Sequence, residues 1–304
     1  MKLSSTLAMT VALAAVLAGC GTGSSRPDIP PLGEVSSITS VRQVVRPIDA
    51  YLPTASQNQI AERAIHLTTA RCLRQFGSSE PPGADPAQTE TKTKTAKRDV
   101  RAQLFGYFAP DLVATTGYNA VSAPEPQTPT SASTPQILTG RDKAGNVITE
   151  YRGKSVPKGG CLQKGLDAVG GSMFLTVASV IPAGGPKEPL NDPRIVNANH
   201  QWSACMKSYG FAYATPADAY MDPRWHTQPS GVTSVAHSPT EIATATADTA
   251  CKQSTNFMGI AVAVQTAYDK QYIAANKAQL ASFTQRLHKH IADAEKIVSD
   301  GGVV

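Results

Sequence analysis

Apolar positions recur at helical spacing in two stretches of the chain that end in the same way. On the first stretch one stripe holds Ala61, Ile65, Thr68, Cys72 and Phe76, and on the second it holds Ala198, Trp202, Cys205 and Tyr209. Steps of three and four residues predict amphipathic helices. Ser56-x-x-Gln59 is typical of a capping box for the first helix, and Asp192-Pro193 is typical of the start of the second. Gly77 and Gly210 follow as left-handed stops.

The ends of these two stretches also form an internal repeat. Residues 72–77 and 205–210 share the order Cys, large apolar, basic, any residue, aromatic, Gly. Each copy is followed by a second cysteine in a Cys-x-Gln context, at Cys161 and at Cys251. A duplicated element of this kind predicts two related helical units, which we place at 54–190, with loop insertions, and at 191–304.

The last third of the chain carries the clearest helical signal. Ser238-Pro239-Thr240-Glu241 combines an N-cap serine, a proline at the first helical position and a glutamate three residues after the cap, which predicts a helix through Cys251. No Pro or Gly interrupts 260–299, and the heptad-like stripe there is Ile273, Leu280, Phe283, Leu287, Ile291, Ala294 and Val298. We therefore expect a mostly α-helical body that ends in a long C-terminal helix.

The first helical unit contains segments that cannot contribute much to a core. Residues 78–95 and 122–136 are rich in Pro, Thr, Ser or Lys and are predicted to be long loops. Between them, the spacing of Val100, Leu104, Phe105 and Phe108 predicts a short amphipathic helix. Residues 142–151, with Gly145-Asn146 inside, predict a small hairpin.

The N-terminus reads as an export signal. Met1 and Lys2 precede an apolar run at 7–17, which is shorter than the roughly 20 residues that span a bilayer. The sequence Leu17-Ala18-Gly19-Cys20 resembles the lipobox of bacterial lipoproteins. This resemblance implies a signal peptide at 1–19, a diacylglyceryl group on Cys20 and a protein held on the extracytoplasmic face of the cell membrane. An ordinary secretory signal, cut elsewhere, is the alternative. Residues 20–53 form the predicted tether, whose first part is rich in Pro and Ser and whose later part, 35–48, is apolar enough to dock on the body.

Charge adds little to this picture. The chain has 28 Lys plus Arg against 23 Asp plus Glu, a formal net charge of +5 that is spread along the sequence. Nothing resembles a basic arm, so nucleic acid is not an expected partner.

Cysteine usage favours disulfides over a metal site. After acylation of Cys20, four cysteines remain in an oxidising compartment, and three pairings are possible. The repeat favours Cys72 with Cys161 and Cys205 with Cys251. A four-cysteine zinc site would need tight Cys-x-x-Cys pairs, which are missing from the sequence. We expect neither a metal nor a cofactor.

One segment is a candidate binding site. Six of the 18 aromatic residues, including both tryptophans, fall within residues 202–225, beside charged and polar side chains. The candidate ligand-binding residues are Trp225, Asp218, Asp222, Arg224 and His226. Aromatic faces with nearby polar groups suit sugars and peptides, whereas the alternative is that these rings form the core around Cys205. No Gly-x-Ser-x-Gly, Ser-x-x-Lys or phosphate-loop motif is present, so no catalytic residue is predicted.

Several of these segments together resemble a family of secreted lipoproteins from actinomycetes. The likeness rests on 72–77, on Val156-Pro157-x-Gly159-Gly160-Cys161, on 202–211, on Arg224-Trp225 and on Glu241-Ile242-Ala243 with Asp248 and Cys251-Lys252. It implies an envelope location and a helical body with two disulfides, and it carries no catalytic residues.

The sequence therefore favours a lipid-anchored envelope protein that acts by binding or scaffolding, with another envelope protein or a cell-wall glycan as partner. The alternative is an envelope hydrolase or a glycan- or peptide-binding protein that uses residues 202–226. A solute-binding protein with two α/β lobes is disfavoured, because strands and helices do not alternate along the chain.

Overall fold

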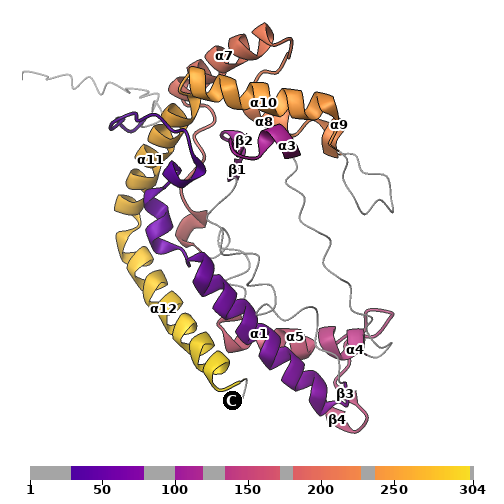
Figure 1. Ribbon diagram of the computed structural model, residues 1–304. Helices are drawn as coiled ribbons and strands as arrows, with labels where there is room; N and C mark the ends of the chain where they lie inside the picture. Colours follow the sequence, from indigo (N-terminus) through magenta and orange to yellow (C-terminus); the bar gives the residue numbers. More distant parts are fainter. Residues whose placement is uncertain (1–28, 79–99, 119–133, 172–180, 227–236, 302–304) are drawn as a thin grey trace, which may run out of the picture.

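The computed structural model describes residues 29–78, 100–118, 134–171, 181–226 and 237–301, and in this part the chain is mostly helical (Figure 1). The α-helices are α1 (Ala55–Gln75), α3 (Val113–Thr116), α4 (Thr134–Thr139), α5 (Gly160–Ala168), α7 (Pro193–Ser208), α8 (Pro216–Tyr220), α9 (Pro223–His226), α10 (Pro239–Ser254), α11 (Phe257–Ala275) and α12 (Lys277–Ser299). The 3-10 turns are η1 (Val41–Gln43), η2 (Pro47–Tyr51) and η4 (Pro182–Gly184). The predicted signal peptide, Cys20 and most of the two predicted loops lie outside the described residues.

Two small antiparallel hairpins complete the described elements. The first pairs β1 (Val100–Ala102) with β2 (Gly106–Phe108), and the second pairs β3 (Glu150–Tyr151) with β4 (Lys154–Ser155). The mostly α fold predicted from the sequence is therefore confirmed, with a long C-terminal helical segment in α11 and α12.

The α1 bundle consists of α1, α4, α5, α12 and the β3–β4 hairpin. α1 packs against both α5 and α12, and α12 runs beside it along the left of Figure 1. Ala61, Ala64 and Ile65 of α1 share a buried cluster with Phe283 and Leu287 of α12. A disulfide joins Cys72 at the end of α1 to Cys161 in α5.

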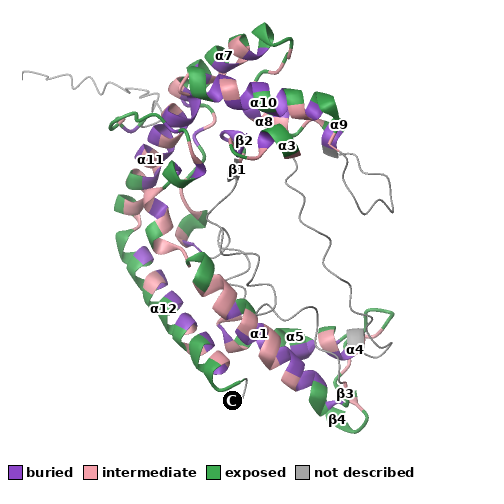
Figure 2. Cartoon of the chain, viewed as in Figure 1, coloured by how far each residue is buried: buried purple, intermediate pink, exposed green. Residues whose placement is uncertain are grey.

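The α10 bundle consists of α3, α7, α8, α10, α11 and the β1–β2 hairpin. Its core is the largest buried cluster and is built around Trp202, Tyr107, Tyr118 and Phe257. Figure 2 shows the buried residues of α10 and α11 facing the other elements of this bundle, whereas much of the outer side of α12 is exposed. A second disulfide joins Cys205 of α7 to Cys251 of α10. Both disulfides are the pairs that the internal repeat favours.

Each bundle contains elements from both of the predicted units, 54–190 and 191–304. The β1–β2 hairpin and α3 belong to the first unit but pack against α8 and α10, and α12 belongs to the second but packs against α1. The repeat itself is visible in the helix ends, because Gly77 and Gly210 both have positive φ, at 81° and 86°, and each follows the C-cap residue of its helix, α1 or α7. Each repeat cysteine is then linked to a later helix.

The segment that precedes α1 lies against the body, as the apolar residues at 35–48 predict. The guanidinium of Arg194 donates to the carbonyl oxygen of Pro30 at 2.9 Å. Arg46 donates two hydrogen bonds to the buried carboxylate of Asp269 on α11, at 3.0 and 2.6 Å. In the described part of the predicted tether, the chain is therefore attached from Pro30 onward.

Most of the predicted helix starts are present. Asp192 caps α7 by accepting from Arg194 N, and Ser238 caps α10 by accepting from Glu241 N. The cap of α1 differs from the prediction: Thr54, not Ser56, accepts from the backbone of Gln57, whose side chain accepts from Thr54 N in return. The predicted capping box therefore has the right chemistry but begins two residues too late.

The predicted helix around Val100 is wrong, since residues 100–108 form the β1–β2 hairpin. Gly106 has a φ of 63°, and a Cβ at that position would collide with the backbone carbonyl of Pro216. The close approach of α8 and the positive φ therefore both demand glycine and a tight turn. The hairpin predicted at 142–151 is present only in part. Arg141 and Val147 form an isolated antiparallel β-bridge, and the paired strands β3 and β4 lie slightly later in the chain.

The C-terminal helical segment has a break that the uninterrupted pattern does not predict. α11 ends at Ala275 and α12 begins at Lys277, with Asn276 between them at φ −118° and ψ 22°. The side-chain nitrogen Nδ2 of Asn276 donates to the carbonyl oxygen of Tyr272 at 2.9 Å. The backbone N–H of Asn276 also donates to this carbonyl, at 3.0 Å, so the break is a local change in the backbone angles of Asn276 across which this hydrogen bond is kept.

Candidate functional site

The tryptophan of the predicted site belongs to the core. Trp225 is only 4% exposed and stacks on Tyr118, with ring centroids 5.7 Å apart. Its indole nitrogen donates to the carbonyl of Ala219 at 3.0 Å. The guanidinium carbon of Arg224 lies 4.8 Å from the centre of the Trp225 ring. Trp225 therefore presents no open ring face to a ligand.

Two charged residues of the predicted site satisfy each other. Arg224 Nη2 lies 2.7 Å from Asp222 Oδ2 and donates at 2.6 Å to the hydroxyl of Tyr213, which in turn donates to Asp222 at 2.8 Å. The hydrogen bonds from Arg224 hold the pKa of Asp222 well below its ordinary value. Burial and the neighbouring Asp222 raise the pKa of Tyr213 to about 12. Asp222 is thus held as a carboxylate and is a poor candidate for a general acid.

The remaining two predicted residues lie apart from this trio. Asp218 closes the capping box of α8: its carboxylate accepts from Thr215 N at 3.0 Å, and its own N–H donates to the Thr215 hydroxyl at 3.2 Å. Asp218 also lines a pocket of about 460 Å³ together with Tyr220 and Met221. His226 ends α9, and its side chain lies outside the described residues. The structure brings together Trp225, Arg224 and Asp222 of the predicted set.

A buried polar network lies beside this aromatic cluster, and the sequence did not predict it. Asp248 accepts from the indole nitrogen of Trp202 at 2.9 Å, from the hydroxyl of Tyr118 at 3.3 Å and from Lys252 Nζ at 2.8 Å. Lys252 also donates to the carbonyl of Tyr107 at 2.6 Å. Burial raises the pKa of Asp248 and lowers that of Lys252. Because its central residues are fully buried, the network holds the core together and is closed to a ligand.

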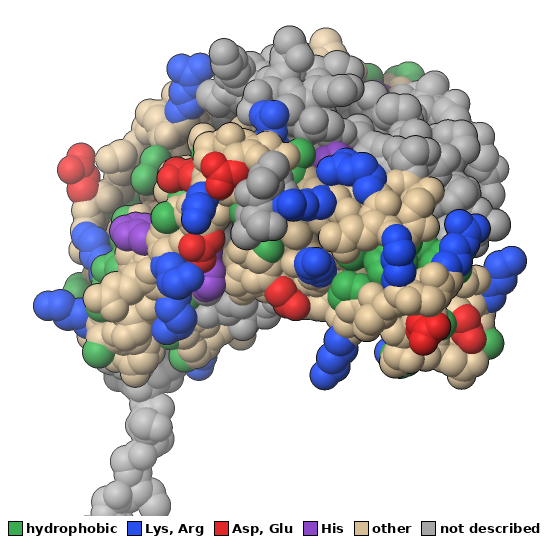
Figure 3. Space-filling model, turned by 90° about the horizontal axis from the view of Figure 1, so that it is seen from below, with side chains coloured by type: hydrophobic (Ala, Val, Ile, Leu, Met, Phe, Trp, Pro, Cys, Tyr) green, Lys and Arg blue, Asp and Glu red, His purple; other side chains and the backbone are tan. Residues whose placement is uncertain are grey.

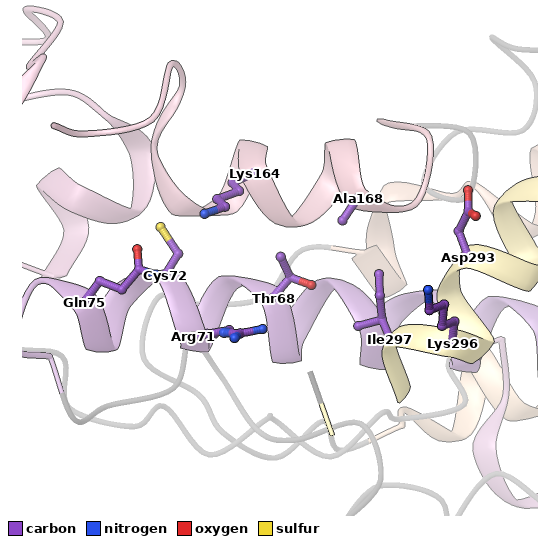
Figure 4. Close-up of a pocket in the computed structure, with 9 residues that line it drawn as sticks. All are labelled: Thr68, Arg71, Cys72, Gln75, Lys164, Ala168, Asp293, Lys296 and Ile297. Carbon is purple, nitrogen blue, oxygen red and sulfur yellow. The ribbon is translucent and has the colours of Figure 1, made fainter. Parts of the chain in front are cut away.

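A different pocket, open to solvent, lies between α1, α5 and α12 (Figure 4). Its volume is about 400 Å³, within the range of small-molecule sites. Arg71 comes from α1, Lys164 from α5 and Lys296 from α12. Thr68 and Gln75 add polar groups. None of these residues was predicted as a site residue, because they lie far apart in the sequence and only the packing of three helices brings them together.

The described ranges hold no group of three or more His, Cys, Asp or Glu side chains that could bind a metal ion. Within the same ranges, no helix is both long and apolar enough to cross a bilayer. Comparison with protein families, with curated proteins and with solved structures finds no match to this chain.

Proposed function

We propose that this chain is a lipid-anchored protein on the extracytoplasmic face of the cell membrane, where it acts by binding or scaffolding. One observation carries the proposal. The four cysteines within the described ranges are joined in two disulfides, and the fifth is Cys20 in the lipobox-like segment. Disulfides persist in oxidising compartments, and the single remaining thiol is the one that a lipoprotein would acylate.

The state of the predicted site argues against the alternative in which residues 202–226 form a catalytic or glycan-binding site. The Trp225 ring is packed and Asp222 is held as a carboxylate by Arg224 and Tyr213, so the trio lacks both an open surface and a free acid. A hydrolase or glycan-binding protein that uses residues 202–226 is accordingly the weaker candidate. The likeness to secreted actinomycete lipoproteins agrees with this proposal, and the envelope partner stays a prediction.

The anchor is tested by Cys20→Ala in cells fed with an alkyne-labelled fatty acid. The unaltered chain should carry label and partition into detergent, whereas the variant should lose the label and move to the aqueous phase or the medium. Two acyl chains give stable anchoring, and their loss removes it.

The matched control is Ser24→Ala, a substitution to the same residue four positions after Cys20 that leaves the lipobox-like segment and both disulfides intact. It should keep both the label and the membrane partitioning. Equal labelling of the unaltered chain and the Cys20→Ala variant would overturn the proposal.

A further inference from the structure

The segment that leads into α1, residues 29–48, lies along one face of α11. Near the start of that helix, Ser36 packs so closely on Gly259 that a Cβ on the glycine would lie 2.1 Å from the Ser36 carbonyl oxygen. Ten residues farther along the helix, Arg46 donates to the buried carboxylate of Asp269. Figure 1 shows the segment, in indigo, beside α11. The 29–48 segment is therefore fixed to α11 at two places about 15 Å apart along the helix axis.

The apolar side chains of this segment divide between two sides. Three of them are buried in the core cluster that also contains the first turns of α11: Ile38, Val41 and Val44. Three others are exposed: Ile29 at 41%, Val35 at 38% and Val45 at 63%. Val44 and Val45 are neighbours in the chain, and only Val44 is buried. The segment therefore has one side that packs on α11 and another that presents apolar side chains to solvent.

Exposed apolar side chains are concentrated in this segment. Single exposed apolar residues are ordinary on protein surfaces, whereas groups of them mark contact sites. In the described ranges after residue 48, the five other large apolar side chains that are exposed are spread over more than seventy positions: Val147, Leu162, Val196, Tyr209 and Met221. The 29–48 segment carries three within 17 positions. Its solvent-facing side is therefore a contact surface by composition.

Charge does not mark a contact face in the same way. Lys and Arg side chains are spread over much of the face of the molecule seen from below in Figure 3. Within the 29–48 segment, the exposed charged side chains are Glu34 and Arg42, which carry opposite charges. A partner of this surface is therefore bound mainly through apolar contact, and its own charge matters little.

We propose that the solvent-facing side of the 29–48 segment lies on the membrane surface, with Ile29, Val35 and Val45 in contact with lipid. This proposal rests on the lipid anchor proposed above at Cys20. Ile29 is nine residue steps from Cys20, so the anchor would hold it within about 30 to 32 Å of the bilayer. A short tether keeps the segment at a high effective concentration beside the membrane, where contacts from a few side chains suffice.

The test is photo-crosslinking of the full chain in the membranes of the cells that make it. Val45→p-benzoyl-phenylalanine introduces a photoreactive side chain that inserts into C–H bonds of the molecule it touches. After irradiation, the mass of the peptide that contains position 45 shows whether a phospholipid has been added. Val35→p-benzoyl-phenylalanine examines the other end of the segment in the same way. Phospholipid adducts are expected at both positions.

The matched control is Val147→p-benzoyl-phenylalanine. Val147 is also a valine, and its exposure of 61% is close to the 63% of Val45, but it lies between α4 and β3, outside the segment. This position should give no phospholipid adduct. Equal phospholipid yields at 45 and 147 would overturn the proposal, because they would indicate random encounters with lipid.

A second measurement keeps the photoreactive residue at position 29 and adds charge to the surface. Val35→Asp, Val45→Asp should lower the yield of phospholipid adduct by about tenfold or more, since a carboxylate is costly to bring into the apolar layer of a membrane. The control pair Val147→Asp, Leu162→Asp should leave the yield unchanged. All four positions are exposed, so the melting temperatures should match that of the unaltered chain.

The anchor and the surface are measured separately. Fatty-acid labelling of Cys20 reports the anchor, and the phospholipid adducts report the surface. A labelled chain without adducts at 35 and 45 overturns the membrane surface and leaves the anchor standing, whereas an unlabelled chain with adducts overturns the anchor alone. Absence of both the label and the adducts overturns both proposals. Adducts to a protein in place of phospholipid would also overturn the membrane surface.

Discussion

Asp248 and Lys252 lie one turn apart on α10, with side chains 1% and 0% exposed, and their charged atoms are 2.8 Å from each other. This pair connects three parts of the α10 bundle, since Asp248 also accepts from Trp202 of α7 and Lys252 donates to the backbone of β2. A buried pair of this kind is costly to break, because removal of one member leaves the other charged group without a partner in a low dielectric.

Lys252→Met should therefore destabilise the protein by about 3 to 5 kcal/mol. The methionine keeps most of the side-chain volume but removes the counter-charge of Asp248 and the Lys252 donor of the Tyr107 carbonyl, while Trp202 and Tyr118 still donate to Asp248. Urea unfolding followed by circular dichroism measures the loss as a lower midpoint.

The matched control for that variant is Lys289→Met. Lys289 and Asp293 form an ion pair at the same helical spacing, but their side chains are 70% and 41% exposed. Exposed pairs contribute at most about 1 kcal/mol, so the midpoint should hardly move. Equal effects of the two substitutions would contradict the role assigned to burial.

Trp225→Ala should cost about 3 to 5 kcal/mol, because it empties the space between Tyr118 and Arg224. Trp202→Ala should be at least as damaging, since it also removes the indole donor of Asp248. Thermal melting measures both. A Trp225→Ala protein with unchanged melting and lost retention on peptidoglycan would instead support the glycan-binding alternative.

Removal of the Cys72–Cys161 disulfide by a double alanine substitution should cost about 4 to 5 kcal/mol in the chain-entropy account, because the bond closes a loop across a sequence separation of 89. Hydrogen exchange should rise mainly in α5, which this bond ties to α1. Alanine substitution of Cys205 and Cys251 should raise exchange in α7 and α10 instead. Uniform changes in both variants would contradict the division into two bundles.

Asp192 should give the protein a measurable pH dependence. Its hydrogen bonds with Arg194 hold the pKa of this buried carboxyl below its ordinary value. A group whose pKa is lowered by folding contributes stability above its unfolded pKa, near 4, and loses that contribution as the pH falls through the folded pKa.

Asp192→Asn keeps an N-cap side chain for α7 but removes the charge. The variant should be less stable than the unaltered chain at neutral pH, and the difference should shrink as the pH falls below about 4. Urea midpoints at a series of pH values measure it. A constant difference across the series would exclude the Asp192–Arg194 pair as its cause.

What the sequence predicted correctly depends on local signals. The starts of α7 and α10 are encoded within four residues, as in Ser238-Pro239-Thr240-Glu241, and the glycines after α1 and α7 require only the chain on either side. The β1–β2 hairpin was missed because Val100, Leu104 and Phe108 also fit a helical period. What decides against a helix is the close contact of Gly106 with Pro216, which is more than a hundred residues away.

The candidate pocket could not be predicted for a related reason. Arg71, Lys164 and Lys296 are separated by more than ninety residues each, and no local pattern marks any of them. For Trp225 the sequence suggested a binding site that the structure does not form. Clustering of aromatic and charged residues in the sequence is compatible with either a cleft or a core. Only the packing of Tyr118 against the ring decides between them.

The hydrogen bond between Arg194 and Pro30 also determines where a force applied to the N-terminus would first act on the folded helices. Pro30 is ten residue steps from Cys20, and a chain of that length spans at most about 33 to 36 Å. If Cys20 is held in a membrane, tension on this leash first meets the Arg194–Pro30 hydrogen bond and passes through Asp192 to the hydroxyl of Tyr268 on α11. Arg46 and Asp269 attach the next part of the leash to the same helix. Under that condition, α7 and α11 would be the first helices to take up the load.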